Sequence, residues 1–421
     1  MTTLAPDAEP ACPGASDARR PDNTKGAAQV AAALAVRGTA FGDIPRAAWD
    51  RLAAANAWAT PFSSWAFQRA WWDAYAGSAH DQTLIVSATA GSAGGREAGE
   101  PVAIVPLMHR HEVEPSDADQ ATKIRHADDL PLTAVPATAK AVFFGASYHA
   151  DYATVLTAPE DLPAVAAVVV DHLASAGIDV DPGHPTPWDV VDLRRLRCGD
   201  PTAEAFATAF GAREMAEGWT LNLEREDVCP VVTLPAGASF DDFLGTLDKK
   251  ARHEIRRKIR RARAGGELRL TESSDPLADL DAFIELHQKK WRADGLFPPT
   301  PGGAASRVFI KRLFELCGGS GPVRLSFLTI GERRVAAGIQ FTTPDTWMFY
   351  NAGIDPDARE LSPGVLLMAE LIRAALGAGA RRFDFLRGDE PYKYEWGSVD
   401  EPIQRLLVRR EHVRGPSEAR R

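Results

Sequence analysis

Residues 382–397 read RFDFLRGDEPYKYEWG. Apolar residues at Phe383, Phe385 and Leu386 predict a short strand, and Gly388 predicts that the chain then turns into a loop. Ionisable and aromatic side chains packed densely after the end of a strand are typical of a binding or catalytic site. The alternative is a structural corner with buried aromatics and solvated charges. The candidate site residues here are Asp384, Asp389, Glu390, Tyr392, Lys393 and Tyr394.

The preceding segment, residues 346–379, predicts a strand and then a helix. The strand covers Trp347 to Ile354, and Ser362 is a favourable N-cap for a helix with Pro363 in its first turn. Free N–H groups at such a helix start form a site for an anion, while the alternative is a helix start with no ligand. The candidate ligand contacts are Tyr350, Asn351, Arg359, Ser362, Gly364 and Val365.

The rest of the C-terminal half supplies alternating helix and strand patterns. Helices are expected over 239–266, 279–295, 307–319 and 362–379, and strands over 267–272, 323–330, 334–343, 346–354, 381–386 and 403–410.

The N-terminal half repeats this order more loosely. Two helices are expected within 44–77, interrupted at Thr60-Pro61, and another over 162–177, with strands over 83–89, 101–110, 141–146, 152–156 and 187–193. The predicted fold class is α/β (α+β), in two lobes that each have a mixed, mostly antiparallel sheet flanked by helices. The expected units are a disordered tail (1–40), an N-terminal lobe (41–235), a C-terminal lobe (236–412) and a second tail (413–421).

The run DFLRGDEPYKYEWG, after an SPG helix start, resembles the CelD-like (cellulose-biosynthesis-type) branch of the GNAT acyltransferase superfamily, which is related to the Fem-type peptidoglycan-bridge transferases. Secondary matches are KARHEIRRKIRRARAGG and the early strand VAIVPLMHR. The resemblance implies tandem GNAT-like lobes and acetyl-CoA, or another acyl-CoA, as the donor bound by the second lobe. The sequence Arg359-Glu360-Leu361-Ser362-Pro363-Gly364 keeps only part of the usual GNAT donor loop.

The implied reaction is N-acyl transfer to a small-molecule or cell-envelope precursor. In our interpretation Asp384, Asp389 or Glu390 is the base or orients the acceptor, Tyr392 or Tyr394 is the oxyanion donor or thiolate acid, and Lys393 contacts an anionic group. One alternative is an aminoacyl-tRNA-dependent Fem-type transferase, although the long coiled-coil insertion of some such enzymes is missing from the sequence. Another is a GNAT-like binding module without catalysis.

The segment Lys249 to Arg263 contains nine Lys or Arg residues among fifteen. Its apolar stripe at Ala251, Ile255, Ile259 and Ala262 predicts a helix that packs on one face and exposes cations elsewhere. Three alternatives remain open: a solvated face, a site for an anionic acceptor contacted by Arg252 and Arg256, or a nucleic-acid surface.

A turn is expected within FFGASYHADYATVL, residues 143–156. In the related enzymes this part of the first lobe lines the acceptor cleft, so the resemblance implies Tyr148, His149, Asp151 and Tyr152 as acceptor contacts. Without it, His149 and Asp151 are ordinary turn residues.

The overall composition restricts the function further. A net charge of −9 over 421 residues argues against a general nucleic-acid binder. The four cysteines are far apart and the histidines do not cluster at ligand spacing, so no metal is expected. No segment has the length of a membrane helix and the start lacks a signal-peptide core, which predicts a soluble cytoplasmic protein.

Overall fold

The computed structural model describes residues 31, 33–90, 95–110, 132–136, 139–175, 187–291, 295–319 and 321–410. The helices are α2 (Arg46–Ala55), α3 (Trp65–Tyr75), α5 (Leu162–Ala174), α6 (Pro201–Glu217), α7 (Phe240–Thr246), α8 (Lys249–Ala264), α9 (Pro276–Trp291), α10 (Pro301–Cys317), α11 (Pro363–Gly377) and α12 (Pro391–Tyr394). The strands are β1 (Leu34–Gly38), β2 (Ala79–Asp81), β3 (Leu84–Ala88), β4 (Pro101–Val105), β5 (Leu107–Arg110), β6 (Ala141–Phe144), β7 (Leu156–Thr157), β8 (Val190–Arg197), β9 (Trp219–Thr233), β10 (Leu268–Glu272), β11 (Val323–Ile330), β12 (Arg333–Thr342), β13 (Thr346–Ile354), β14 (Arg382–Asp384) and β15 (Val399–Arg410).

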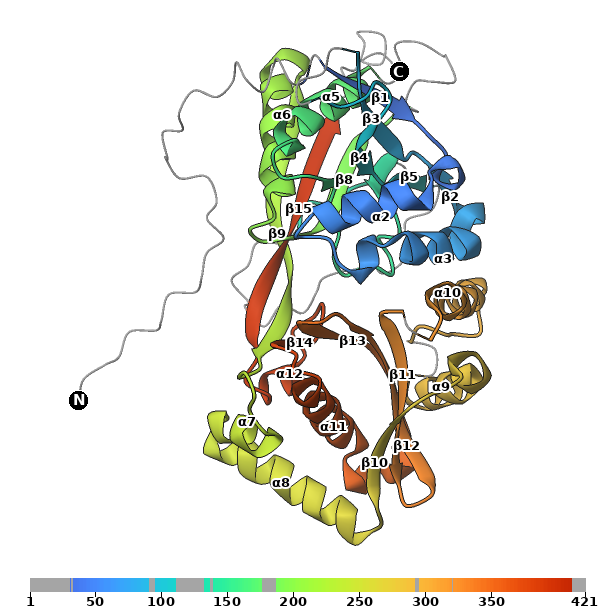
Figure 1. The fold of residues 1–421 in the computed structure, drawn as a ribbon, viewed down its shortest axis with the longest axis vertical. Helices are drawn as coiled ribbons and strands as arrows, with labels where there is room; N and C mark the ends of the chain where they lie inside the picture. Colours follow the sequence, from blue (N-terminus) through green and yellow to red (C-terminus); the bar gives the residue numbers. More distant parts are fainter. Residues whose placement is uncertain are drawn as a thin grey trace, which may run out of the picture.

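One continuous sheet runs through both lobes (Figure 1). Its strand order is β10-β11-β12-β13-β14-β9-β15-β8-β6-β5-β2. Five strands lie beyond β9 and four beyond β15 on the two sides of this central pair, and each side contains one parallel pair, β13 with β14 and β6 with β8. The expected α/β fold of two lobes with mostly antiparallel sheets is therefore confirmed.

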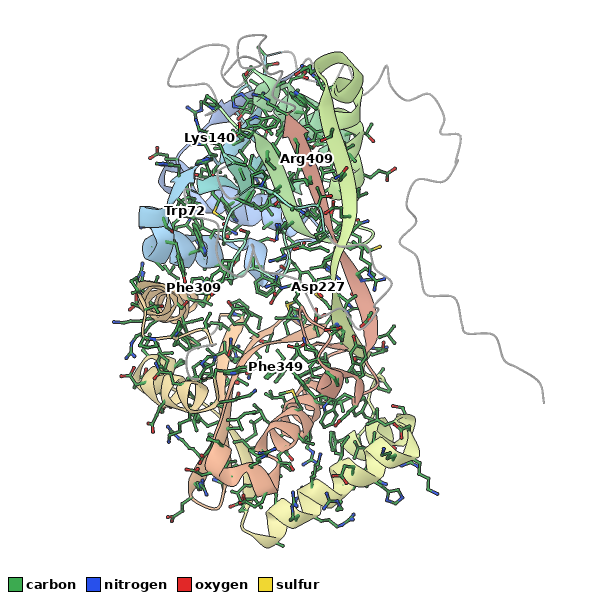
Figure 2. All side chains as sticks on the ribbon, turned by 180° about the vertical axis from the view of Figure 1, so that it is seen from behind. Trp72, Lys140, Asp227, Phe309, Phe349 and Arg409 are labelled. Carbon is green, nitrogen blue, oxygen red and sulfur yellow. The ribbon has the colours of Figure 1, made fainter. Side chains whose placement is uncertain are left out.

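The two central strands each pair with the opposite half of the chain. β9, which follows the N-terminal helices in sequence, pairs with β14, whereas β15, at the end of the C-terminal half, pairs with β8. Because these long strands also pair with each other, they join the lobes into one sheet. Asp227 lies on β9 where the two strands cross between the lobes (Figure 2).

A second sheet of four strands, β1-β3-β4-β7, covers part of the N-terminal lobe. β1 pairs antiparallel with β3 over its whole length. The expectation that the disordered tail extends to residue 40 is therefore wrong at Leu34–Gly38. This short segment is ordered by its backbone hydrogen bonds with β3, which its composition alone did not suggest. Residues 1–30 and 411–421, which contain the rest of the predicted tails, lie outside the described residues.

Two other sequence expectations need correction. The single helix expected over 239–266 is interrupted, because α7 ends at Thr246 and the Asp248 side chain then caps the start of α8 through the N–H groups of Lys250 and Ala251. The helix α6 and the long strand β9 were not predicted. Alanines all around α6 weaken its amphipathic pattern, and β9 is buried in its second half without alternation.

An aromatic interface joins the lobes beside the sheet. Phe62 and Phe67 of the N-terminal lobe contact Phe341 and Phe309 of the C-terminal lobe, with ring centroids 5.1 Å apart in both pairs. Figure 2 shows Phe309 at this boundary. These buried rings fix the two lobes against each other along one side of the site described next.

Candidate functional site

The strands β13 and β14 diverge after a short parallel contact. They pair only at Thr346 with Arg382, Trp347 with Phe383 and Met348 with Asp384, after which β14 ends while β13 continues to Ile354. The backbone edge of β13 beyond Met348 therefore lacks β14 as a neighbour. The divergence leaves an opening between the two strands.

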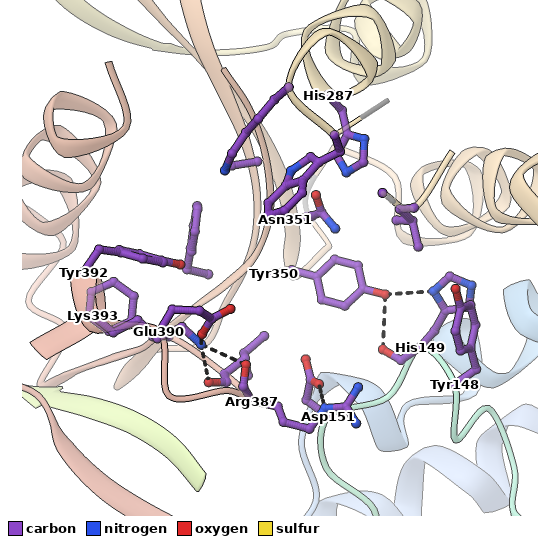
Figure 3. A pocket seen from close by; sticks show the side chains of 18 residues that line it. Tyr148, His149, Asp151, His287, Tyr350, Asn351, Arg387, Glu390, Tyr392 and Lys393 are labelled. Carbon is purple, nitrogen blue, oxygen red and sulfur yellow. Dashed lines mark hydrogen bonds and ion pairs between the residues drawn. The ribbon is translucent and has the colours of Figure 1, made fainter. Parts of the chain in front are cut away.

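Two neighbouring cavities occupy this region. The smaller, of about 160 Å³, lies against the start of α11 and is lined there by Gly364 and Val365. The larger, of about 370 Å³, lies between the lobes (Figure 3). Both cavities are lined by Lys290, Phe349, Ala352 and Tyr392, so they adjoin across one shared wall. The further lining residues of the larger cavity are Tyr148, His149, Asp151, His287, Trp291, Gly295, Leu296, Tyr350, Asn351, Phe385, Leu386, Arg387, Glu390 and Lys393.

The N-terminal lobe contributes one wall through the turn after β6. His149 is buried, and its ring stacks on Phe309 with centroids 4.2 Å apart. Its Nε2 lies 2.8 Å from the hydroxyl of Tyr75, and its Nδ1 lies 3.1 Å from the hydroxyl of Tyr350 on β13. Three of the four predicted acceptor contacts in this turn, Tyr148, His149 and Asp151, line the larger cavity.

The fourth, Tyr152, lies beneath the cavity with Asp384. The Tyr152 hydroxyl donates to Asp384 Oδ2 at 2.7 Å, and Oδ1 accepts the N–H of Leu386. Burial raises the pKa of Asp384 to about 6, against the lowering effect of these hydrogen bonds. Neither side chain lines either cavity, so this geometry favours Asp384 as a support for the loop rather than as a group that contacts ligand.

The loop after β14 is held together by Lys393. Its ammonium donates to the carbonyl oxygens of Leu386, Arg387 and Gly388 at 3.1, 2.8 and 2.9 Å and lies 2.9 Å from a Glu390 carboxylate oxygen. With four acceptors around three N–H groups, this ammonium is fully engaged. The structure gives no support to the expected contact of Lys393 with an anionic ligand and favours a structural role.

The other residues of the loop divide between the cavity and its surroundings. Glu390 and Tyr392 line the larger cavity, and burial raises the pKa of Tyr392. Asp389 and Tyr394 line neither cavity, and the Tyr394 hydroxyl donates to Asp400 at 2.7 Å. Of the six predicted catalytic residues, only Glu390, Tyr392 and the engaged Lys393 therefore reach the cavity.

Several lining residues were missed from the sequence. Arg387 Nε lies 3.4 Å from Asp151 and so forms an ion pair between the lobes. His287 comes from α9, whose backbone lies close to β13. A Cβ atom at Gly353 of β13 would lie only 2.5 Å from the backbone nitrogen of His287, so only glycine allows this approach. Burial lowers the pKa of His287 to about 4. The run HQKKW on α9 was the available signal, but its helical spacing indicated only an amphipathic helix.

The start of α11 is formed by an unusual backbone turn. Ser362 has φ 59°, and its hydroxyl accepts a hydrogen bond from Arg261 of α8 at 3.2 Å. Gly364 and Val365 line the smaller cavity and Tyr350 and Asn351 the larger, whereas Arg359 is exposed and lines neither. Four of the six predicted donor contacts are therefore brought to the two cavities.

Helix α8 lies at the far end of the C-terminal lobe (Figure 1). Arg256 pairs with Asp241 of α7, and Arg252 donates to the carbonyl of Gly245. Neither arginine lines a cavity, so the structure does not bring these two predicted acceptor contacts to the site.

Comparison with known proteins agrees with this geometry. Residues 249–394 match the model of an acetyltransferase (GNAT) domain. FemX has a similar structure over 86% of this chain and 96% of its own length, with a TM-score of 0.53 at 9% identity. The similarity is lower for a conserved protein from Bacteroides thetaiotaomicron, with 12% identity, 88% and 98% coverage and a TM-score of 0.48. It is lower also for a tandem GNAT protein from the clavulanic acid pathway, with 11% identity, 89% and 97% coverage and a TM-score of 0.40. No curated protein sequence matches the chain.

The matched domain extends from α8 through α12 and so contains the diverging strands and the start of α11. The match relates residues 249–394 to the GNAT superfamily of acyltransferases. The fold of the chain is Fem-like. The CelD-like branch stays a prediction.

Two kinds of feature are not found within the described ranges. Among these residues no helix has the length and apolarity to span a membrane. The same residues contain no group of three or more His, Cys, Asp or Glu side chains placed to hold a metal ion.

Proposed function

We propose that this chain is an acyl-CoA-dependent N-acyltransferase, with the donor in the smaller cavity and the acceptor in the larger one. The observation that carries the proposal is the shared wall. A donor that enters beside α11 would present its thioester at Phe349 and Tyr392, where the acceptor cavity begins. Positioning two reactants in adjoining cavities is the main contribution that a protein makes to acyl transfer.

The donor side offers groups suited to pantetheine and phosphates. Beyond Met348 the edge of β13 lacks β14 and presents backbone groups that can hydrogen-bond an extended amide chain. In the first turn of α11 the N–H groups of Val365 and Leu366 donate to the Ser362 carbonyl, so the N–H of Gly364 is the group proposed to bind a donor phosphate. Arg261 adds a cation next to Ser362. Acetyl-CoA is the donor to test first, and the proposed compartment is the cytoplasm.

The acceptor side offers carboxylates and hydroxyls. Glu390 is the proposed base or acceptor-orienting group, because it lines the cavity and remains 55% exposed despite its contact with Lys393. Tyr392 is the proposed acid for the leaving thiolate, because its side chain lines both cavities and a phenol carries its proton at neutral pH. Asp384, Asp389 and Tyr394 are proposed only as supports of the loop.

Coenzyme A binding tests the donor site directly. At a hundred times its dissociation constant, coenzyme A should stabilise the protein by about 2.7 kcal/mol, seen as a rise in Tm. In Gly364→Val the stabilisation should disappear while the unliganded Tm changes little, because a Cβ at this position meets only the flexible end of Ile354, at 3.0 Å. Gly377→Val, at the far end of the same helix, is the matched control. Equal stabilisation of the wild type and Gly364→Val would reject the donor site.

A second candidate is an aminoacyl-tRNA donor. Its support is the cationic surface of α8, where Lys249, Lys250 and Arg260 are exposed, together with the Fem-like fold. Tight, salt-sensitive binding of tRNA with no effect of coenzyme A would favour this candidate over the first.

A further inference from the structure

A chain of hydrogen bonds crosses between the lobes at the acceptor cavity. It runs from Ser306 on α10 to Tyr75 on α3, then to His149, and ends at Tyr350 on β13. All of these side chains except Tyr350 are buried. Tyr350 and His149 line the cavity, and Figure 3 shows the Tyr350 hydroxyl in contact with both the ring and the backbone carbonyl of His149.

The position of each hydrogen in this chain follows from one bond. The Tyr350 hydroxyl lies 3.1 Å from the carbonyl oxygen of His149, and a carbonyl can only accept, so Tyr350 donates its hydrogen there. The same hydroxyl oxygen lies 3.1 Å from His149 Nδ1. Because Tyr350 has a single hydrogen and has already donated it, Nδ1 must be the donor in this second bond.

The donor and acceptor in each of the remaining hydrogen bonds are then determined. The ring is buried and stacked on Phe309, where a neutral imidazole costs less than a charged one. A neutral ring with its hydrogen on Nδ1 accepts at Nε2, so Tyr75 donates to Nε2 at 2.8 Å. Since the hydrogen of Tyr75 is used, Ser306, whose hydroxyl lies 2.9 Å away, donates to Tyr75.

We propose that this series of hydrogen bonds fixes His149 as the Nδ1–H tautomer and thereby makes the Tyr350 oxygen a hydrogen-bond acceptor toward the cavity. Tyr350 then cannot donate to the carbonyl of a thioester. It accepts instead from an N–H group. The carboxylate of Asp151, on the same wall, is already paired with Arg387, whose Nε lies 3.4 Å away. His149 is thus a positioning residue that gives this wall a preference for a ligand that donates an N–H group, such as a primary amine.

The ligand class rests on the function proposed above, because it takes the cavity as the acceptor site. The tautomer does not depend on that function and is measured on the unliganded protein. Two-bond ¹H–¹⁵N spectra of protein labelled with ¹⁵N-histidine distinguish a protonated Nδ1 from a protonated Nε2. The His149 signals are assigned by their loss in His149→Asn, and His253→Asn, an exposed change on α8, is the control.

We expect His149 to show the Nδ1–H pattern near neutral pH in the wild type. We expect the same pattern in Ser306→Ala, because the Tyr75 hydroxyl still donates to Nε2 in that variant. In Tyr350→Phe the Nδ1–H loses its acceptor, so we expect a new population protonated at Nε2. A wild-type ring protonated at Nε2, or at both nitrogens, would overturn the tautomer whether or not coenzyme A binds.

Recognition of an N–H group is tested with two cations that differ in hydrogen-bond donors. Propylammonium should shift the His149 nitrogen signals in a saturable way, and propyltrimethylammonium, which has the same charge and no N–H, should not. An equal response to both probes, or a response to neither, would overturn the proposed amine preference. Absence of coenzyme A binding would refute the proposed function and leave the tautomer standing.

Discussion

The two parallel strand pairs of this protein start alike and end differently. β13 and β14 pair at three positions and then diverge around a cavity. β6 and β8 also pair at three positions, but the chain after β6 turns back and meets β8 again at the bridge between Ala153 and Leu196. The returning turn contains Tyr148 and Asp151, which line the larger cavity between the lobes. One lobe thus keeps an open junction, and the other uses the equivalent segment to form a wall.

The junction between β6 and β8, which the returning turn closes, also contains buried charges; we call it the closed junction. Arg405 of β15 forms two hydrogen bonds with Asp192 of β8, at 2.7 and 2.8 Å, and both side chains are 1% exposed. It also lies 3.1 Å from Glu224. We infer that the two junctions have separate roles, in which changes at the closed one affect stability and changes at the open one affect binding.

The largest expected effect is at the closed junction. Arg405→Leu removes one of the two arginines that pair with the buried Asp192. It should lower the free energy of unfolding, measured by urea denaturation, by about 3 kcal/mol, the low end for a broken buried pair, because Arg194 Nε stays 3.1 Å from Asp192. The control is Arg382→Leu on β14, where the pair with Glu401 is about one-third exposed and should contribute at most about 1 kcal/mol. Similar losses for both variants would contradict the proposed difference between the junctions.

The next effect concerns Asp384, at the position where β14 leaves β13. Its pKa in the folded protein is raised from 3.8 to about 6, so folding takes up a proton between these values. The contribution of Asp384 to stability therefore falls as pH rises from about 4 to about 6, by up to about 3 kcal/mol.

Asp384→Asn should remove that part of the pH dependence while its side-chain oxygen still accepts from Tyr152. The measurement is the difference in unfolding free energy between pH 4 and pH 7 for the variant and the wild type. Glu332→Gln, a change at an exposed carboxylate, is the control. An unchanged pH dependence in Asp384→Asn would show that Asp384 is not the group that takes up the proton.

A smaller effect is expected at Lys393, in the open junction. Lys393→Met leaves the carbonyls of Leu386, Arg387 and Gly388 without their donor and should lower the unfolding free energy by about 2 kcal/mol. Glu390→Gln, which keeps these bonds, should be close to wild type in stability. If Lys393→Met instead kept its Tm and abolished turnover once an acceptor is known, Lys393 would have the ligand contact first suggested by its sequence context.

The sequence predicted the open junction better than the closed one. The β13 strand, the α11 helix and the loop around Glu390 and Tyr392 have local patterns, namely an apolar run, a Ser-Pro-Gly start and a dense aromatic and charged cluster. Arg405 and Asp192 are not marked by any local sequence pattern, because the two residues are 213 positions apart in the chain. The exchange of β9 and β15 between the lobes is hidden for the same reason, since neither strand records in its own residues which half it will pair with.

The site residues show the same limit. The sequence suggested Lys393 and Asp384 from their residue types, but only the structure shows that Lys393 bonds the carbonyls of its own loop and that Asp384 accepts from Tyr152 and Leu386. The sequence-based prediction missed His287, because the helical spacing of its segment accounts for a histidine on α9 without a binding site. Tyr75 and Ser306 were missed because their partners are far away in sequence: Tyr75 lies 74 positions from His149 and 231 positions from Ser306.

The smallest effects separate the open junction from the rest of its lobe, within the single helix α8. Arg261 reaches Ser362 at the start of α11, whereas Arg256 pairs with Asp241 at the other end of α8. Both arginines are at or near the surface, so each substitution to alanine should change the unfolding free energy by at most about 1 kcal/mol. If donor phosphates bind at the start of α11, Arg261→Ala should weaken coenzyme A binding about fivefold, equivalent to about 1 kcal/mol, and Arg256→Ala should leave the affinity unchanged. Titration calorimetry at two salt concentrations measures both constants, and the difference should shrink at high salt because exposed charges are screened. Equal weakening by the two variants would mean that coenzyme A responds to the general charge of α8, and the donor phosphates would then have to be placed along the helix rather than at the open junction.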